Sequence, residues 1–286
     1  MKQVQWFPGH MFKSLREIRE KLKLMDIIYL LVDARLPFSS MNPEILQIIG
    51  DKPTLLLFNK IDLADRKTVD QWVKYYESLG FFTLLINSSN GFNVNKIYTK
   101  SKEILDEKIE RSKSKGMKFD RVRGMILGIP NVGKSTLINK LVSKKATTVG
   151  NRPGVTKAQQ WIKINPNFEL LDTPGVLWPK FDDAAVGYAL AVTGAIKDDT
   201  LPISQVVVYA INYLKEFYPK RLKERYNIEN ASDLNEIEIL DHIGQLRGAL
   251  VKGGQTDYDR VYSIILTDIR NKQLGALSFD HRQSSI

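Results

Sequence analysis

The stretch GIPNVGKS, residues 128–135, restricts the fold of this chain more than any other segment. It follows the apolar run RGMILG and leads into STLINKLV, so a strand, a glycine-containing loop and a helix are expected in that order. Gly128 and Gly133 permit the torsions that point successive backbone N–H groups at an anion. Lys134 then reaches the β- and γ-phosphates of a nucleotide, and the Ser135 hydroxyl binds Mg²⁺. The spacing therefore predicts a nucleotide site.

Strand-like and helical patterns alternate through residues 1–178. Apolar runs typical of buried strands occupy residues 26–33, 54–58, 82–86, 125–129, 158–164 and 168–172. The last two are joined by Asn-Pro-Asn, a turn typical of a hairpin, whereas polar turns and helical patterns follow the others. Repeated strand–helix units predict an α/β fold with a six-stranded, mostly parallel sheet and one antiparallel edge.

Beyond residue 178 the strand pattern ends and apolar residues recur at helical spacing. The examples are Val207, Ile211, Leu214 and Tyr218, then Ile237, Leu240, Ile243 and Leu246, and then Val261, Ile265 and Ile269. We therefore predict two domains. Residues 1–178 carry the nucleotide site behind an N-terminal extension, and residues 179–286 form a smaller all-α domain.

A second motif, LLDTPG at residues 170–175, closes an apolar strand. An acidic residue at a strand end can hold Mg²⁺, so Asp172 is a predicted metal ligand, and the Gly175 N–H can sense a γ-phosphate. The loop NRPGVTKAQQW lies between the two motifs, and its Thr156 is a candidate second Mg²⁺ ligand. A loop threonine alone says little, so this prediction depends on its place between the motifs.

The run LLLFNKID, residues 55–62, ends a buried strand with Asn59, Lys60 and Asp62. The Asp62 carboxylate can accept two hydrogen bonds, from N1–H and from the exocyclic amine of guanine. Adenine has an acceptor at N1 and no amine there, so it would leave a charged acceptor unpaired at a cost of about 1–3 kcal/mol or more. The aliphatic stem of Lys60 can cover one face of the base, and Asn59 can brace the loop. GTP is the predicted nucleotide.

A third strand end, INSSN at residues 86–90, is expected to present the N–H groups of Ser88 and Ser89 to the guanine carbonyl oxygen. The predicted nucleotide-binding residues are Asn59, Lys60, Asp62, Asn87, Ser88, Asn131, Val132, Gly133, Lys134, Ser135, Thr136 and Gly175. The predicted metal ligands are Ser135, Thr156 and Asp172.

The motifs occur in the order NKID, NSS, GIPNVGKS, PGVT and DTPG, so the base-reading segment precedes the phosphate loop. This order resembles the circularly permuted GTPases and, within them, closely resembles the ribosome biogenesis GTPase A family of bacteria. The resemblance rests on QWFPGHM, LVDARLPFSSMNP, NKID, GIPNVGKSTLIN, RPGVTK, LLDTPGVLWPKF and VTGAIKD, and it extends to IRNKQLG near the C-terminus. It implies a circularly permuted P-loop GTPase sheet followed by the all-α domain. Because domain termini usually lie close together, permutation leaves the sheet and pocket intact.

Many GTPases place a glutamine directly after DxxG to orient the attacking water. Here Val176, Leu177 and Trp178 follow, and none of these side chains can orient a water molecule. His10, beside a proline, a glycine and an aromatic pair, is the candidate substitute. The resemblance implies the same catalytic role, because the family's histidine matches this position. A lone histidine is otherwise usually structural.

Two further features have weaker interpretations. Cation-activated GTPases often carry asparagine at the position of Asn131, where its oxygen helps to hold K⁺, and the resemblance implies stimulation by K⁺. The alternative is that Asn131 only caps the turn. The string VDARLP ends the first strand, and we assign Asp33 and Arg35 no chemistry beyond bracing the loop.

The net charge of +10, with basic clusters in residues 1–23 and 108–124, favours a polyanionic partner. Nucleic acid is the first choice and an anionic membrane surface the weaker one. The chain has no cysteine, which excludes disulfides and thiolate metal sites. Its longest apolar runs are far shorter than the ~20 residues needed to cross a bilayer, and the N-terminus lacks a secretion core. A cytoplasmic location is predicted.

The resemblance implies a GTP-hydrolysing switch that binds the maturing large ribosomal subunit and promotes a late assembly step. The basic surfaces and the all-α domain are expected to bind ribosomal RNA, and for that domain the resemblance implies the same. Because no glutamine follows DxxG, hydrolysis is expected to be slow without the subunit. A monomer is expected off the ribosome. The alternative is a GTP-gated RNA-binding module in which hydrolysis is incidental. The permuted order and the missing apolar anchor disfavour a GTPase acting on transfer RNA or at a membrane.

Overall fold

The computed structural model describes residues 9–116, 121–143, 159–178, 181 and 183–281, with the backbone alone at residues 9–11, 113 and 143. The candidate metal ligand Thr156 lies outside these residues. The chain divides into one unit of Met1–Lys180 with Asp280–Ile286 and a second unit of Phe181–Phe279. The second unit thus begins close to the predicted boundary at residue 178, but Asp280 and His281 group with the first.

The described residues of the first unit form a six-stranded sheet in the order β3-β2-β1-β4-β6-β5. The strands are β1 (Ile27–Asp33), β2 (Thr54–Asn59), β3 (Phe82–Leu85), β4 (Val122–Gly128), β5 (Gln160–Asn165) and β6 (Phe168–Asp172). All neighbours pair in parallel except β5 and β6, which form an antiparallel hairpin. The predicted α/β fold with one antiparallel edge is therefore confirmed.

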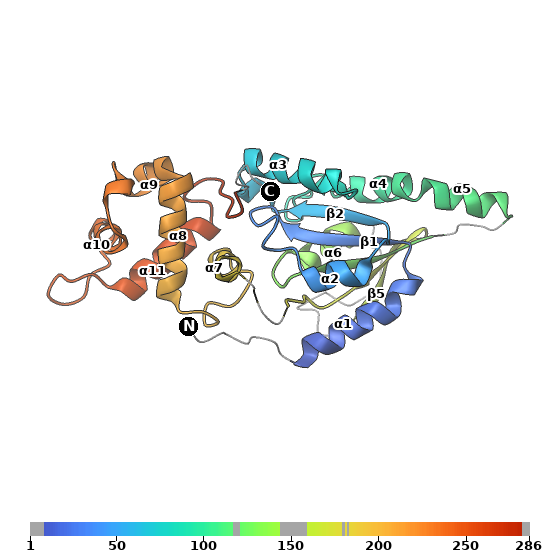
Figure 1. Ribbon diagram of the computed structural model, residues 1–286, viewed down its shortest axis with the longest axis horizontal. Helices are drawn as coiled ribbons and strands as arrows, with labels where there is room; N and C mark the ends of the chain where they lie inside the picture. The colour runs from blue at the N-terminus through green and yellow to red at the C-terminus, as the bar shows by residue number, and fades with distance from the viewer. Residues whose placement is uncertain (1–8, 117–120, 144–158, 179–180, 182, 282–286) are drawn as a thin grey trace. The chain divides into compact units, whose positions relative to one another are not determined.

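Helices lie on both sides of this sheet (Figure 1). They are α1 (Gly9–Lys21), η1 (Leu22–Leu24), α2 (Pro43–Ile49), η2 (Ile61–Leu63), α3 (Arg66–Ser78), α4 (Lys96–Ile104), α5 (Asp106–Ser114) and α6 (Lys134–Ser143). Their starts follow local chemistry. The Asn42 side chain accepts from the N–H groups of Glu44 and Ile45 ahead of α2, and Asp65 accepts from Lys67 N–H ahead of α3.

Alternate residues of the central strands face opposite layers of helices. On one face, Tyr29 of β1 donates to or accepts from Ser101 of α4 at 2.7 Å and packs edge-on against Phe168 of β6. On the other face, Phe58 of β2 packs against Tyr76 of α3. Every residue of β1 and β2 is buried, which is why both strands read as continuous apolar runs.

The strand register brings the predicted motifs to one edge of the sheet. Asp33 at the end of β1 pairs with Asn59 at the end of β2, and Gly128 at the end of β4 pairs with Leu31 of β1. Asp172 at the end of β6 lies beside Ile126 of β4. Ligands of open α/β sheets bind outside the carboxyl ends of the strands, so a ligand site is expected at this edge.

The second unit is helical, as the sequence predicts. It contains α7 (Ala184–Val192), α8 (Ile203–Phe217), α9 (Pro219–Tyr226), η3 (Ala231–Asp233), α10 (Glu236–Arg247) and α11 (Tyr258–Arg270). The Arg270 guanidinium at the end of α11 donates to the carbonyls of Ala191 and Val192 at 2.7 and 3.1 Å, and so caps α7. Buried Asp268 accepts from Arg225 and Tyr226, which ties α11 to α9.

Within the described parts of the chain, no helix combines the length and the apolar character that crossing a membrane requires.

Candidate nucleotide-binding site

The phosphate loop joins β4 to α6, and its two glycines are required by close contacts as well as by their torsions. Gly128 has φ +153°, and a Cβ there would lie 2.7 Å from the carbonyl oxygen of Leu31. Gly133 has φ +103°, and a Cβ there would lie 2.4 Å from the Asn59 side-chain nitrogen. Any larger residue at either position would push the loop away from the strands that support it.

Lys134 begins α6 with its ammonium turned into this loop. The Nζ atom donates to the carbonyl oxygens of Gly128 and Ile129, each at 2.9 Å, and the side chain is buried. Burial lowers the pKa of Lys134 to about 8, although the negative charge of Asp172 acts in the opposite direction. The cation therefore lies beside the acidic end of β6, inside the loop that the sequence assigns to phosphates.

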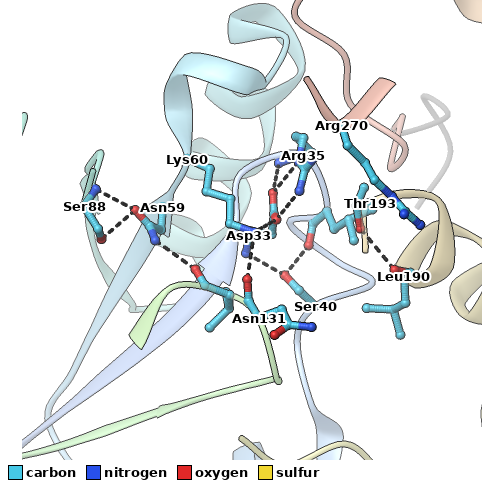
Figure 2. Close-up of polar contacts among 12 residues, drawn as sticks. Asp33, Arg35, Ser40, Asn59, Lys60, Ser88, Asn131, Leu190, Thr193 and Arg270 are labelled. Atoms are coloured by element: carbon cyan, nitrogen blue, oxygen red, sulfur yellow. Dashed lines mark hydrogen bonds and ion pairs between the residues drawn. The ribbon is translucent and has the colours of Figure 1, made fainter. Parts of the chain in front are cut away.

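The base-reading segment contacts the phosphate loop directly, although 73 positions separate Asn59 from Val132. The Asn59 Nδ2 donates to the Val132 carbonyl at 2.8 Å, and its Oδ1 accepts from the N–H and hydroxyl of Ser88 at 3.0 and 2.8 Å. The Lys60 Nζ donates to the Asn131 carbonyl at 2.8 Å. Figure 2 shows Asn59 and Lys60 reaching the same loop from the end of β2. The structure thus brings together segments that the sequence places far apart.

Asp62 lies in η2, directly after Lys60, and its side chain is exposed. Lys60 adopts the left-handed backbone conformation, with φ 61° and ψ 35°. This conformation is unfavourable for a residue with a side chain, so surrounding contacts must maintain it. The exposed carboxylate of Asp62 is available to a ligand at the edge of the sheet.

Sequence reasoning missed the role of Asp33 and of Asn42. Asp33 accepts from Lys60 Nζ at 2.9 Å, and the Asn42 Nδ2 donates to the Val176 carbonyl at 3.0 Å. Asp33 ends β1, and we assigned it only bracing, whereas Asn42 precedes α2 and had no predicted role. The available signal was a carboxylate that ends an apolar strand beside the strand of the NKID motif.

The loop after β3 differs from what the sequence suggested. The N–H of Ser88 donates to Asn59 Oδ1, and the N–H of Ser89 donates to Asn87 Oδ1 at 2.8 Å. Asn90 N–H also donates to Asn87 Oδ1. In the structure these N–H groups therefore shape the loop and support Asn59, instead of pointing outward toward a guanine carbonyl.

The DTPG segment packs against the phosphate loop. Asp172 is fully buried, and Thr173 Oγ1 donates to the Ile126 carbonyl at 2.7 Å. A Cβ at Gly175 would lie 2.7 Å from the Cα of Pro130, so only glycine permits this approach. The Val176 N–H then donates to the Gly128 carbonyl at 3.3 Å. These contacts place the Gly175 backbone beside the loop that would hold the phosphates.

The residues after DTPG are apolar and buried, with relative exposures of 1% for Val176, 0% for Leu177 and 9% for Trp178. The side chains of Val176 and Leu177 carry no polar group, and that of Trp178 carries an indole N–H. His10 lies in the first turn of α1, where the structure describes its backbone and not its side chain. The position of its imidazole therefore stays a prediction.

The base-reading segment NKID precedes the phosphate loop by about a quarter of the chain. In the folded structure its Asn59 and Lys60 side chains donate hydrogen bonds to that loop. This arrangement at the carboxyl edge of a mostly parallel sheet defines the class, a circularly permuted P-loop GTPase. Comparison with known proteins identifies its branch. Residues 123–249 match a family described as 50S ribosome-binding GTPase.

Two curated relatives, each a ribosome biogenesis GTPase A, match nearly the whole chain. The protein of Priestia megaterium is 52% identical over 97% of this chain and 96% of its own length. That of Bacillus licheniformis is also 52% identical, over 97% of this chain and 98% of its own. A GNP-bound YlqF from Thermotoga maritima matches with a TM-score of 0.65 and 25% identity, covering 94% of this chain and 98% of that one. The chain therefore belongs to the ribosome biogenesis GTPase A family. It is a GTPase with a role in ribosome biogenesis.

Proposed function

We propose that this GTPase binds the maturing large ribosomal subunit and promotes a late step of its assembly, using GTP hydrolysis as the timer. The proposal is supported by the hydrogen bonds from Asn59 and Lys60 to the phosphate loop, which would join the separated motifs into a single guanine-nucleotide site. The 50S in the name of the matching family and the net charge of +10 support the large subunit as partner. The protein would act in the cytoplasm, as a monomer when off the ribosome.

In this site Asp62 reads guanine, Lys60 covers the base, and Gly133, Lys134 and Ser135 bind the phosphates. The remaining members of the proposed nucleotide-binding set are Asn59, Asn87, Ser88, Asn131, Val132, Thr136 and Gly175. Ser88 and Asn87 act in it by shaping the loop that holds Asn59.

Mg²⁺ fits the donors at this edge of the sheet. The Asp172 carboxylate is buried at the end of β6, and Ser135 lies in the first turn of α6. Carboxylate and hydroxyl oxygens are the hard ligands that Mg²⁺ prefers, and Mg²⁺ usually completes its shell with phosphates and water. Asp172 and Ser135 would hold the ion, with Thr156 as a further ligand. The ion would neutralise charge that develops on the phosphate oxygens.

Hydrolysis needs a group that orients water, and the buried Val176, Leu177 and Trp178 do not supply one. We assign this role to His10. Asn131 has a left-handed backbone with φ 56°, which turns the loop at the position proposed to hold K⁺. Subunit binding would complete the catalytic arrangement, so turnover is expected to be slow in the free protein.

The second unit supplies the proposed RNA contact. Helix α9 has the sequence PKRLKERY and carries the cations Lys220, Arg221, Lys223 and Arg225. The last three already pair with Glu224, Glu229 and Asp268, so RNA phosphates would have to replace these carboxylates. Such a group binds phosphates by counterion release, so association with the subunit should weaken steeply as salt rises.

The test is GTP turnover by the full chain with and without purified large subunits, in potassium and in sodium. We expect stimulation of at least about tenfold by subunits, since orienting and activating groups contribute factors of this size or more. His10→Ala should keep GTP and subunit binding and lose the stimulation. Equal turnover with and without subunits would contradict the proposal. An unchanged assembly function in His10→Ala would favour the GTP-gated module, in which hydrolysis is incidental.

A further inference from the structure

Lys60 of the NKID segment is held by the buried carboxylate of Asp33, which is not among the predicted nucleotide-binding residues. Its Nζ donates to Asp33 Oδ2 at 2.9 Å as well as to the Asn131 carbonyl at 2.8 Å. Its backbone is left-handed, and the next residue begins η2, which carries Asp62. Figure 2 shows the Lys60 side chain reaching toward Asp33. Because Lys60 immediately precedes η2, contacts that fix Lys60 also restrict the position of Asp62.

Asp33 itself is fixed in direction by Arg35. The Arg35 Nε donates to Asp33 Oδ1 at 3.0 Å and its Nη2 to Oδ2 at 2.8 Å, while the Arg35 N–H also donates to Oδ1. The Asp33 N–H donates to Ser40 Oγ at 3.0 Å. A bidentate arginine–carboxylate pair sets geometry as well as charge. Both residues are buried, with relative exposures of 1% and 3%, so water does not loosen the pair.

Positive and negative charges alternate from Arg35 through Asp33 and Lys60 to Asp62. Burial raises the pKa of Asp33, but the Arg35 and Lys60 cations outweigh it and hold the pKa far below its usual range. Burial lowers the pKa of Arg35, but the Asp33 carboxylate and then the charge of Asp62 raise it overall. The pKa of Arg35 is therefore raised by two carboxylates, that of buried Asp33 and that of exposed Asp62.

We infer that Asp33 and Arg35 are positioning residues for guanine selectivity: they hold Lys60 in its left-handed conformation and thereby aim the Asp62 carboxylate at the guanine edge. The inference rests on the proposed nucleotide site. Neither residue belongs to the proposed nucleotide-binding set. Without the Asp33 carboxylate, Lys60 keeps only the Asn131 carbonyl, and η2 is free to relax toward a conformation that does not require a left-handed residue.

A purely structural ion pair would have different consequences. Loss of such a pair would lower the stability of the protein and weaken the binding of all nucleotides by the same factor. Misplacement of the Asp62 carboxylate would instead weaken the binding of each nucleotide according to the number of hydrogen bonds that Asp62 accepts from it. Guanine offers N1–H and the exocyclic amine, whereas hypoxanthine offers N1–H alone. The ratio of affinities for GDP and inosine diphosphate therefore measures how well the Asp62 carboxylate is positioned, and it is insensitive to global stability.

The experiment measures displacement of a fluorescent GDP analogue from the full chain by GDP, inosine diphosphate and ADP. In Asp33→Asn, which keeps the shape of the side chain and removes its charge, we expect GDP affinity to fall at least about tenfold, and inosine diphosphate affinity to fall much less. Arg35→Lys keeps the charge and loses the bidentate geometry, so it should give an intermediate ratio.

Asp70→Asn is the matched control, because Asp70 pairs with Arg66 on the exposed face of α3 and should leave the ratio unchanged. A wild-type ratio in folded Asp33→Asn would overturn the inference. If that variant does not fold, an unchanged ratio in Arg35→Lys overturns it. Failure of the proposed site looks different: wild-type protein would then prefer ADP, or Asp62→Ala would bind GDP as tightly as wild type.

Discussion

Burial of Lys134 inside the phosphate loop weakens the hold of its amine on a proton. Its Nζ is surrounded by the carbonyls of Gly128 and Ile129, and burial lowers its pKa to about 8 in spite of nearby Asp172. Phosphates brought into the loop would stabilise the charged form and raise this pKa again. We therefore predict that Lys134 links nucleotide binding to proton uptake.

Near pH 8, GDP binding should therefore take up about half a proton, because a pKa of about 8 leaves half of the Lys134 amines neutral beforehand. The measurement is calorimetric titration in buffers of different ionisation enthalpy, and the uptake should shrink as the pH falls toward 7. Lys163→Ala on exposed β5 is the control and should keep the uptake. Binding enthalpies that do not depend on the buffer at pH 8 would contradict this prediction.

Among the elements, β4 lies at the centre of the sheet and admits no side chain at Gly124. A Cβ at this position would lie 2.1 Å from Tyr29 Cε2 and 3.2 Å from Leu170 Cδ2. The Tyr29 ring cannot swing away, because its hydroxyl is hydrogen-bonded to Ser101 and its edge packs on Phe168. The strand that precedes the phosphate loop is therefore packed closely against Tyr29 of β1 and Leu170 of β6 at this glycine.

Gly124→Ala should lower the free energy of unfolding by about 1–3 kcal/mol, the usual penalty of overpacking a core. Urea denaturation monitored by circular dichroism measures it. The double variant Gly124→Ala, Tyr29→Leu should be less destabilised than the sum of the single variants, because the smaller side chain removes the clash. Strict additivity of the two single effects would show that Tyr29 is not the obstacle.

At the scale of the whole molecule, the chain returns to its first unit after the helical unit. Asp280 is buried and accepts from the N–H groups of Phe38 and Ser39, both at 2.8 Å, and from the Ser39 hydroxyl. The Trp72 indole N–H of α3 donates to the Asp280 carbonyl at 2.6 Å. The chain thus joins the sheet unit at both ends of the helical unit, and Asp280 is anchored in the loop after β1 that contains Arg35, Phe38 and Ser39.

This anchor should make stability depend on pH. Burial raises the pKa of Asp280 from 3.8 to about 6, against the hydrogen bonds from Ser39 and Phe38 and with a further increase from the charge of Asp33. The folded protein therefore binds this proton more tightly than the unfolded chain does. The stabilisation is complete below about pH 4 and is lost as pH rises through about 6, a change of about 3 kcal/mol.

Asp280→Asn cannot ionise, so the difference in free energy of unfolding between wild type and variant should shift in favour of the variant as pH rises from 4 to 7. Urea denaturation at half-unit steps of pH measures this difference. Asp51→Asn, at an exposed turn, should show no such trend. A difference that stays constant across this range would contradict a raised pKa at Asp280.

Much of the site could be predicted because its parts are local. The spacing of Gly128, Gly133 and Lys134 is dictated by how a loop folds around phosphate, and the NKID string ends a strand whose burial is visible in its composition. Side-chain partners were harder to predict. Asn59 appeared as a brace without its partner Val132, and the N–H groups of Ser88 and Ser89 were expected at guanine although they donate to asparagines.

The sequence by itself determined the order of strands and helices, the phosphate loop, and the permuted order of the motifs, because each depends on spacing within a few residues. The tertiary structure alone decided that Asp33 holds Lys60, that Asn42 reaches Val176, and that Asp280 returns to Ser39. Those partners lie 27, 134 and 241 positions apart. The physical reason is that such contacts depend on which loops and strand ends the folded sheet brings together, and no local pattern of residues encodes that arrangement.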